Sequence, residues 1–222
     1  MRDLTIVFDL DGTLIDTAPD LIHATNHVIV GEGLAPMPAE ALRPWISHGA
    51  RRLIEVGLAA RGQNRTSAEV DVLLDRFLAY YEANIAVESR PFEGLLSVLD
   101  TAAAAGARLA VCTNKREYLS RMLLDQLALT PRFAAIAGRD TFPVCKPHPD
   151  HLFGAIRLAG GDPTRAVMVG DSDVDVATAK AAGIPVVAVT FGYTSIPISE
   201  LSADAVIDHY DAFLPALARI AG

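Results

Sequence analysis

Lysine is scarce in this sequence. Three lysines occur among 19 lysine and arginine residues, against 27 aspartate and glutamate residues, and the formal net charge is −8 at pH 7. Nucleic acids and anionic membranes bind basic protein surfaces, so this composition argues against either as a partner. If the ligand is an anion, a metal ion or a few basic side chains must concentrate positive charge locally.

Cysteines and long apolar runs are also few. The two cysteines, Cys112 and Cys145, are typical of a reducing compartment rather than of a disulfide scaffold. No apolar run reaches the length of a transmembrane helix, and the first residues do not resemble a signal peptide. We therefore expect a cytoplasmic protein. The sequence leaves open whether it is a monomer or a homodimer.

Short apolar segments rich in β-branched residues alternate with segments of helical periodicity over most of the chain. This alternation predicts an α/β fold, with a Rossmann-like parallel sheet and helices on both faces. The expected strands are residues 4–8, 108–112, 133–137, 166–169, 185–189 and 205–207. The expected helices between and after the later strands are residues 115–127, 149–159, 174–182 and 211–220.

The alternation is interrupted once. About a hundred residues separate the first two strands, far more than one crossover helix needs. Helical periodicity recurs in that interval at residues 17–30, 39–46, 50–60 and 68–84, and the core resumes with a helix at 92–104. We predict an inserted all-α subdomain over residues 15–88, and a core made of residues 1–14 and 89–222.

Acidic residues stand where two of the strands end. Asp9 and Asp11 follow the first strand, and Asp171, Asp173 and Asp175 follow the fourth. Ligands of open parallel sheets bind at the carboxyl ends of the strands, so we expect these acids to meet. Oxygen donors without histidine or cysteine favour a hard cation, most plausibly Mg²⁺. In the alternative interpretation, the acids at 171–175 only cap the following helix.

A phosphate-binding function is indicated by the residues near this acidic group. Thr113 and Asn114 follow the second strand, and Lys146 lies in a proline-rich turn. A hydroxyl, backbone amides and a compact ammonium beside a metal ion make a site for phosphoryl oxygens. The alternative is that Lys146 is an ordinary solvated lysine, but the scarcity of lysine favours a function.

Four ordered segments resemble the motifs of the haloacid dehalogenase superfamily of phosphotransferases. They are residues 9–13 (Asp-Leu-Asp-Gly-Thr), residues 112–114 (Cys-Thr-Asn), residues 146–147 (Lys-Pro) and residues 170–175, from Gly170 to Asp175. Any one motif would be weak support, but four in order, each at a strand end, are specific. The position of the insert is similar to that of the helical cap in the first cap class of this superfamily.

The resemblance implies a role for each motif. Asp9 would be the nucleophile that forms an aspartyl-phosphate, and Asp11 the general acid and then the general base. Asp9, the backbone carbonyl of Asp11, and Asp171 would hold Mg²⁺, with Asp175 orienting a ligand. Thr113 and Lys146 would bind the transferring phosphoryl group. The substrate would be a small-molecule phosphate ester.

Some members of the superfamily fit this chain poorly. Dehalogenases lack the second acid, which is present here as Asp11, and phosphonate-cleaving enzymes need a cap lysine, which residues 15–88 lack. Mutases of the β-phosphoglucomutase type use a cap histidine at the position that holds Leu21 here, and also a cap lysine. His23 and His27 lie nearby on the first predicted cap helix, but we expect them to be structural or solvent-facing.

The closest resemblance is to the bacterial phosphoglycolate phosphatases. It rests on residues 16–21, on the Thr113-Asn114-Lys115 triplet, and on residues 191–194 and 204–208. The leading substrate is therefore 2-phosphoglycolate. The alternatives are a sugar phosphate, a nucleotide or pyrophosphate, a phosphosugar mutase, or, in a different class, a phospho-aspartate signalling receiver.

Further substrate contacts are expected from the insert and from the start of the helix after the second strand. Arg51 and Arg52 follow His48-Gly49-Ala50 in a segment whose family equivalent faces the active site, and Lys115 begins a helix close to the phosphate site. These three are the candidates for binding a substrate carboxylate or phosphate. Solvated arginines that merely cover apolar surface are an equal alternative. Trp45, Tyr80 and Tyr81 are expected to pack in the core of the insert.

Overall fold

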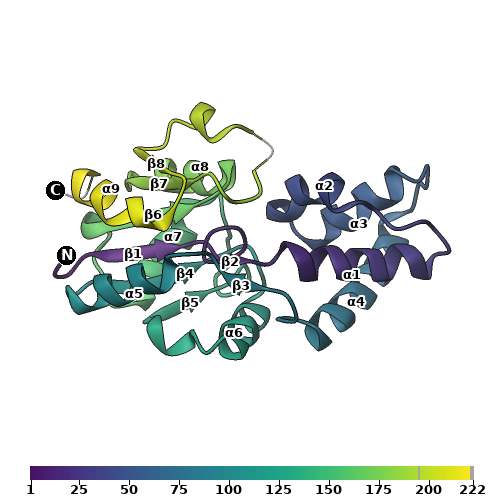
Figure 1. The fold of residues 1–222 in the computed structure, drawn as a ribbon, viewed down its shortest axis with the longest axis horizontal. Helices are drawn as coiled ribbons and strands as arrows, with labels where there is room; N and C mark the ends of the chain where they lie inside the picture. Colours follow the sequence, from purple (N-terminus) through teal and green to yellow (C-terminus); the bar gives the residue numbers. More distant parts are fainter. Residues whose placement is uncertain (195, 221–222) are drawn as a thin grey trace.

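Six parallel strands form the central sheet (Figure 1). The structure is a computed structural model that describes residues 1–194 and 196–220. The spatial order of the strands is β5-β4-β1-β6-β7-β8. Their bounds are β1 (Thr5–Phe8), β4 (Arg108–Cys112), β5 (Ala135–Ala137), β6 (Ala166–Gly170), β7 (Val186–Val189) and β8 (Ala205–Ile207). Each predicted strand is present, with ends shifted by at most two residues.

Helices cover both faces of this sheet, which confirms the predicted fold class. The bounds are α5 (Leu95–Ala104), α6 (Glu117–Gln126), α7 (Pro149–Leu158), α8 (Asp173–Ala182) and α9 (Phe213–Ile220). Alternate residues of β1 point to opposite faces: Ile6 and Phe8 join the apolar cluster of α5, α6 and α9, whereas Val7 joins that of α7 and α8. A sheet buried on both faces requires apolar strands throughout, as the sequence has.

Four helices between β1 and α5 form a separate helical segment at one end of the molecule (Figure 1). They are α1 (Ala18–Gly31), α2 (Ala39–Leu42), α3 (Ala50–Ala59) and α4 (Ser67–Ala83), with the 3₁₀ helix η1 (Arg43–His48) between α2 and α3. The longer helices α1, α3 and α4 pack against one another. The helix expected at 39–46 becomes 3₁₀ from Arg43 onward, next to Pro44, whose ring nitrogen cannot donate a helical hydrogen bond.

A two-stranded antiparallel sheet joins the helical segment to the core. Strand β2 (Ile15–Asp16) leads into the segment and β3 (Arg90–Pro91) leads out, with Asp16 opposite Arg90. Buried Asp20, near the start of α1, accepts hydrogen bonds from the backbone N–H groups of Glu88 and Ser89. The two crossings of the chain are therefore held side by side. Strands of two residues are too short for a periodic signal, so the sequence did not predict them.

The remaining 3₁₀ turns connect the core elements. They are η2 (Thr130–Arg132), η3 (Pro163–Arg165), η4 (Ile198–Glu200) and η5 (Tyr210–Ala212). Within the described residues, no helix combines the length and the apolar character needed to cross a membrane.

Candidate active site

The predicted site residues follow three neighbouring strands. Asp9 comes directly after β1, Thr113 after β4, and Asp171 after β6. Since β1 lies between β4 and β6 and all three are parallel, their carboxyl ends meet at one edge of the sheet. The structure brings these residues together as the sequence predicts, and their chemical roles remain predictions.

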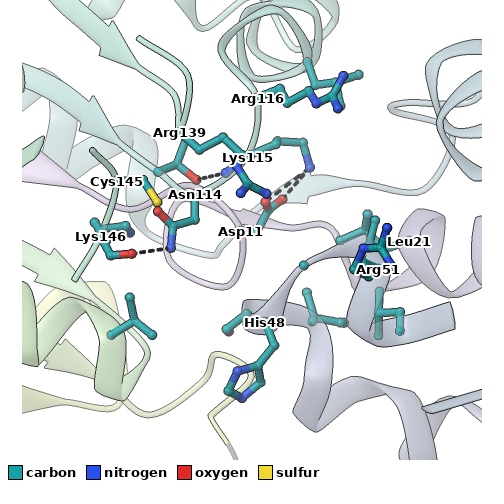
Figure 2. Close-up of a pocket in the computed structure, with 18 of the residues that line it drawn as sticks. Asp11, Leu21, His48, Arg51, Asn114, Lys115, Arg116, Arg139, Cys145 and Lys146 are labelled. Atoms are coloured by element: carbon teal, nitrogen blue, oxygen red, sulfur yellow. Dashed lines mark hydrogen bonds and ion pairs between the residues drawn. The ribbon is translucent and has the colours of Figure 1, made fainter. Parts of the chain in front are cut away.

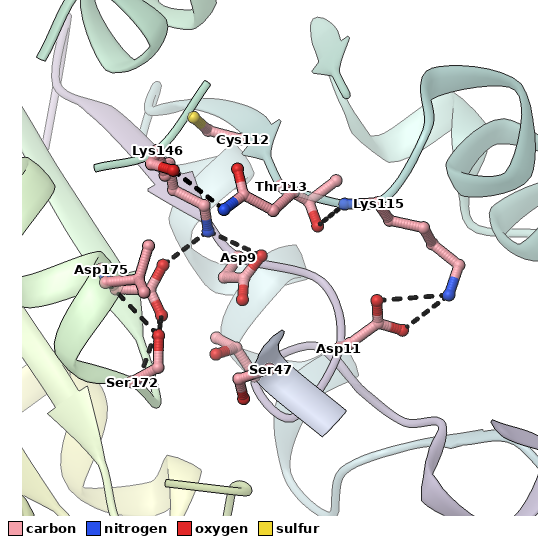
Figure 3. Close-up of polar contacts among 12 residues, drawn as sticks. Asp9, Asp11, Ser47, Cys112, Thr113, Lys115, Lys146, Ser172 and Asp175 are labelled. Atoms are coloured by element: carbon pink, nitrogen blue, oxygen red, sulfur yellow. Dashed lines mark hydrogen bonds and ion pairs between the residues drawn. The ribbon is translucent and has the colours of Figure 1, made fainter. Parts of the chain in front are cut away.

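Lys146 reaches the same place from the loop between β5 and α7 (Figure 3). Its Nζ lies 2.9 Å from Oδ1 of Asp9 and 2.5 Å from Oδ1 of Asp175, and all three residues are buried. Burial raises the pKa of Asp9 to about 6, against the opposing effect of Lys146. Burial also acts to lower the pKa of Lys146, but Asp175 and Asp9 outweigh it and hold that pKa above its usual value. Lys146 is therefore a fixed cation beside Asp9, not a solvated lysine.

Asp171 is held by groups from two other parts of the chain. Its Oδ1 accepts a hydrogen bond of 3.1 Å from the Thr13 hydroxyl, and its Oδ2 accepts one of 2.8 Å from the Tyr193 backbone N–H. Burial raises the pKa of Asp171, and the nearby Asp175 raises it further. Gly12, at φ +86°, passes so close that a Cβ there would lie 2.4 Å from Oδ2 of Asp171. A glycine is therefore needed at position 12.

Asp175 serves the local fold as well as the site. Ser172 is the N-cap of α8, and Asp175, three residues later, completes a capping box by accepting the Ser172 backbone N–H at 3.1 Å. The capping interpretation of this acidic run is thus correct for Asp175, which also ion-pairs with Lys146. Both roles are compatible because they use different oxygens of one carboxylate.

Three of the buried carboxylates form an acid cluster, defined here as Asp9, Asp171 and Asp175. One oxygen from each lies within 4.8 Å of the others. Buried like charges at this separation repel each other, and a cation among them relieves that repulsion. The donors are all oxygen, so the cluster fits a hard divalent metal ion. The side chain of Asp11 is outside the cluster; the expectation for Asp11 concerned its backbone carbonyl and remains a prediction.

The Asp11 side chain is directed away from Asp9 (Figure 3). Its Oδ1 accepts hydrogen bonds of 2.7 Å from the Thr17 hydroxyl and 3.0 Å from Nζ of Lys115, which also lies 3.2 Å from Oδ2. The Lys115 side chain is 6% exposed. Burial acts to lower the pKa of Lys115, but Asp11 and Tyr81 outweigh it and raise the pKa above its usual value. Asp11 and Lys115 therefore form a largely buried ion pair.

The segment after β4 is fixed by contacts among its own residues and with the Lys146 loop. The backbone N–H of Lys115 donates to the Thr113 hydroxyl at 3.2 Å, and Nδ2 of Asn114 donates to the Lys146 backbone carbonyl at 3.0 Å. Thr113 is buried and Asn114 is half-buried. The Thr113 hydroxyl thus lies at the edge of the sheet beside Asp9, where it was expected to bind phosphoryl oxygens.

Sequence analysis did not single out His151, which holds the Lys146 loop. His151 is fully buried, its Nδ1 accepts the Lys146 backbone N–H at 3.1 Å, and its Nε2 lies 3.0 Å from the Gly138 carbonyl. These contacts require Nε2 to carry the proton. Burial lowers the pKa of His151 to about 4, so the ring is neutral. In the sequence, His151 is marked only by its position five residues after Lys146. That position does not distinguish it from the neighbouring His148, whose side chain is exposed to solvent.

A cavity of about 440 Å³ opens between this sheet edge and the helical segment (Figure 2). Asp9, Asp11, Thr113, Lys115 and Lys146 line it from the core. The lining from the helical segment includes Leu21, residues 46–51 of η1 and α3, and Tyr81 of α4. The predicted phosphate site therefore faces a partly open cavity of small-molecule size.

The two candidate arginines are placed differently. Arg51 lines the cavity and is ion-paired with Asp71 and, at 3.8 Å, with Glu55. Arg52 is not among the described residues that line the cavity, and its guanidinium lies 4.6 Å from the centre of the Trp45 ring. Both side chains are more than one-third exposed. Their roles in substrate binding stay predictions.

The aromatic residues and histidines of the insert mostly behave as expected. Trp45 and Tyr80 pack against the apolar core, and His27 stacks on Tyr80 with ring centres 4.1 Å apart. His23 is exposed and lies 3.5 Å from Glu88. Tyr81 is buried as expected but also lines the cavity, with its ring 4.6 Å from Nζ of Lys115. This second contact was not predicted.

Comparison with known proteins agrees with this geometry. The sequence model of the haloacid dehalogenase-like hydrolases matches residues 6–189. A phosphoglycolate phosphatase from Mesorhizobium japonicum is 51% identical over 96% of this chain and 94% of its own length. Another, from Caulobacter vibrioides, is 48% identical over 95% of this chain and 89% of its own. A crystal structure described as a predicted phosphoglycolate phosphatase from Haemophilus somnus superposes with a TM-score of 0.88, at 30% identity, over 96% of this chain and 97% of its own.

The chain therefore belongs to the haloacid dehalogenase-like hydrolase family. Within that family it is a phosphatase, a phosphoric monoester hydrolase. The resemblance found in the four motifs is confirmed, as is the α/β core that they were expected to occupy.

Proposed function

We propose that this protein hydrolyses 2-phosphoglycolate to glycolate and phosphate in an Mg²⁺-dependent reaction through an aspartyl-phosphate on Asp9. The observation that carries the proposal is the buried pairing of Asp9 with Lys146, at 2.9 Å, beside Thr113 at the edge of the sheet. Similar sequences named phosphoglycolate phosphatase support the substrate.

Asp9 attacks phosphorus, and the bond from phosphorus to the glycolate oxygen breaks. Two anions must approach each other in this step, and Lys146 offsets that repulsion because it contacts Asp9 and carries three N–H donors. Thr113 and Lys146 donate to the phosphoryl oxygens, on which negative charge develops.

Asp11 supplies the proton transfers on either side of the intermediate. It gives a proton to the departing glycolate oxygen, and then accepts one from the water that attacks the phosphorus of the aspartyl-phosphate. The attack by water releases phosphate and regenerates Asp9. In the present structure Asp11 is ion-paired with Lys115, so its side chain must turn toward the substrate and take up a proton from solvent before it can act as the acid.

Asp9, Asp171 and, through its backbone carbonyl, Asp11 would hold Mg²⁺, with Asp175 orienting a ligand. Bound there, Mg²⁺ would neutralise phosphoryl charge and allow the acid cluster to remain ionised. The support for this is the buried all-oxygen cluster.

We also propose that residues 15–88 act as the substrate-specificity cap, over a catalytic core of residues 1–14 and 89–222. The cavity lined by both parts supports this division. Arg51 and Arg52 on the cap, and Asn114 and Lys115 on the core, are the candidate residues for binding the rest of the substrate. An anion in the cavity could draw Arg51 away from Asp71, because exposed ion pairs are weak.

Phosphate release by the purified protein tests the proposal. The panel holds 2-phosphoglycolate, sugar phosphates, nucleotides and pyrophosphate, each assayed with Mg²⁺ and with EDTA. We expect the highest kcat/KM for 2-phosphoglycolate, and loss of activity in EDTA. A higher kcat/KM for another ester would retain the chemistry and replace the substrate, whereas equal rates in EDTA would exclude the metal requirement.

A further inference from the structure

Lys115 is the second buried cation of the cavity, and it lies where the core meets the helical segment. Its Nζ contacts Asp11 of the core at 3.0 Å (Figure 2), and it lies 4.6 Å from the Tyr81 ring centre on α4. The Tyr118 hydroxyl of α6 donates to Glu82, which fixes the end of α4 against the core beside Lys115. A ligand in the cavity thus meets Lys115 and Tyr81 together.

The Tyr81 hydroxyl has an unused hydrogen-bonding capacity. Tyr81 is 1% exposed, and among residues 1–194 and 196–220 its hydroxyl has no partner at hydrogen-bond geometry; the neighbouring Lys115 ammonium can only donate, so the phenolic O–H is left without an acceptor. A buried hydroxyl without a partner destabilises the folded protein, so its presence in a cavity lining indicates a group that arrives with a ligand. Because a phenol donates one hydrogen bond, an anionic oxygen is a suitable partner.

The other cations that line the cavity are less suited to hold a buried anion. The Arg51 side chain is 38% exposed, and Arg116 and Arg139 are exposed, so none of them would shield an anion from water. Lys146 contacts two carboxylates, Asp9 and Asp175, and is assigned to the phosphoryl group, whereas Asp11 is the one carboxylate that pairs with Lys115 in the part of the chain that the structure describes. Among the described residues of the lining, Lys115 is the buried cation that remains for the part of the substrate distant from phosphorus.

We propose that Lys115 and Tyr81 bind the carboxylate of the substrate, and that this carboxylate takes the place of Asp11 as the ionic partner of Lys115. The proposal rests on the proposed function and adds a residue pair that recognises the substrate. A second carboxylate arriving at Lys115 repels Asp11, because like charges at contact distance disfavour each other. Released from Lys115, Asp11 takes up a proton from solvent, gives up its Thr17 contact and turns toward the leaving oxygen, to which it donates that proton.

In this exchange the substrate carboxylate binds to Lys115 and, by doing so, releases Asp11 for its role as general acid. An ester without a carboxylate leaves Asp11 paired with Lys115, so the acid is held away from the leaving oxygen and turnover is slow. An ester with a carboxylate at the right distance releases Asp11 as it binds. Specificity then appears in kcat as well as in KM.

The test compares 2-phosphoglycolate with 2-hydroxyethyl phosphate, in which a neutral hydroxymethyl group replaces the carboxylate. Tyr81→Phe is expected to lower the ratio of the two kcat/KM values by about tenfold, through a higher KM for 2-phosphoglycolate. Lys115→Met is expected to lower that ratio by about 100-fold or more, and to raise kcat for 2-hydroxyethyl phosphate above wild type. The rise is the signature of a released Asp11, which a merely structural lysine would not produce.

Two matched variants serve as controls. Lys180 is exposed in the last turn of α8, and Tyr80 adjoins Tyr81 but stacks on His27. Lys180→Met and Tyr80→Phe should leave the ratio of the two kcat/KM values unchanged. If Lys115→Met does not fold, Tyr81→Phe still tests the carboxylate subsite. This variant should fold, because removing an unpartnered hydroxyl should not lower the melting temperature.

The results distinguish a failure of the carboxylate subsite from a failure of the proposed function. Equal losses on both substrates in Tyr81→Phe, or in a folded Lys115→Met, would overturn the exchange and leave the proposed function standing. A fall in kcat for 2-hydroxyethyl phosphate in Lys115→Met would overturn the release of Asp11. A wild-type protein that hydrolyses neither substrate would overturn the proposed function itself, and this subsite with it.

Discussion

The strand ends of the core and the exposed surface of the helical segment use charged residues in opposite ways. In the core, Asp9, Lys146 and Asp175 form ion pairs with side chains that are at most 10% exposed. In the helical segment, Arg51 and Asp71 pair with side chains that are 38% and 60% exposed. Buried charges are costly unless paired, whereas exposed pairs contribute little and exchange partners readily. Asp9, Lys146 and Asp175 therefore provide fixed charges for the chemistry, and Arg51 on the helical segment has pairs that a ligand can rearrange.

The largest effect expected is on turnover, at Asp9. Asp9→Asn removes the nucleophile, so kcat should fall by about 10⁴-fold or more, measured as phosphate release from 2-phosphoglycolate. The fold should persist, because an amide occupies nearly the same volume and needs no counter-ion. A circular dichroism spectrum and melting curve control for this. Wild-type-like turnover in the folded variant would exclude the aspartyl-phosphate mechanism.

The largest expected effect on stability is at Lys146. Lys146→Met leaves Asp9 and Asp175 buried without their cation, which should lower the free energy of unfolding by about 3–5 kcal/mol in metal-free buffer. Lys180→Met is the matched control and should change it by less than about 1 kcal/mol. Urea denaturation measures both. Similar values for the two variants would contradict the contrast between buried and exposed charge.

The pH dependence of stability should report the raised pKa of Asp9. In the folded protein this pKa is about 6, above the usual 3.8, so the folded state binds more protons between these values and stability falls as pH rises through them. In EDTA, the melting temperature of Asp9→Asn relative to wild type should therefore increase from pH 4 to pH 7. The full difference corresponds to about 3 kcal/mol. Mg²⁺ should reduce it by stabilising the wild type, and a pH-independent difference would contradict the charge assignment.

A smaller loss is expected at His151, which acts on Lys146 through its backbone. His151→Leu leaves the Lys146 N–H without its partner and removes one of two hydrogen bonds to the Gly138 carbonyl, which also accepts the Thr141 N–H, at a cost of about 1–3 kcal/mol. Because burial lowers the pKa of His151 to about 4, its contribution to stability grows as pH rises from 4 to 6.5. Thermal melts at pH 5 and pH 7 should show the larger loss at pH 7. The opposite order would mean that the buried ring is protonated.

The smallest effect on stability is expected at Arg51 of the helical segment. Arg51→Met breaks exposed pairs with Asp71 and Glu55, so the free energy of unfolding should change by less than about 1 kcal/mol. If Arg51 binds substrate, KM for 2-phosphoglycolate should rise while the melting temperature stays constant. A decrease in the free energy of unfolding as large as that of Lys146→Met would contradict the contrast between buried and exposed ion pairs.

The sequence predicted the elements with strong periodicity and the residues at strand ends. The β-branched runs fixed the six strands, and the sheet order then placed Asp9, Thr113 and Asp171 together. The pairing of Asp11 with Lys115 was not predictable, since it depends on side-chain directions and not on spacing. His151 was missed for a related reason: its two hydrogen bonds join backbone groups that are separated along the chain.

Tyr81 shows what helical periodicity predicts about a residue and what it does not predict. Its position on α4 predicts an inward-facing aromatic ring, and the ring is indeed buried. Periodicity does not reveal that the buried face of α4 meets the core near Lys115, because that contact joins residues from two parts of the fold. Specificity residues at such a boundary need the three-dimensional structure.

The paired strands β2 and β3 make the helical segment a replaceable module. Ile15 lies opposite Pro91 and Asp16 opposite Arg90, so the segment leaves and rejoins the core at adjacent backbone positions. A piece of chain inserted between neighbouring positions can change in length or be exchanged with little displacement of the surrounding scaffold. We expect a shorter or foreign segment grafted between Asp16 and Arg90 to leave β1 and Asp9 in place. Evolution could then alter what this scaffold recognises while keeping the groups at its strand ends.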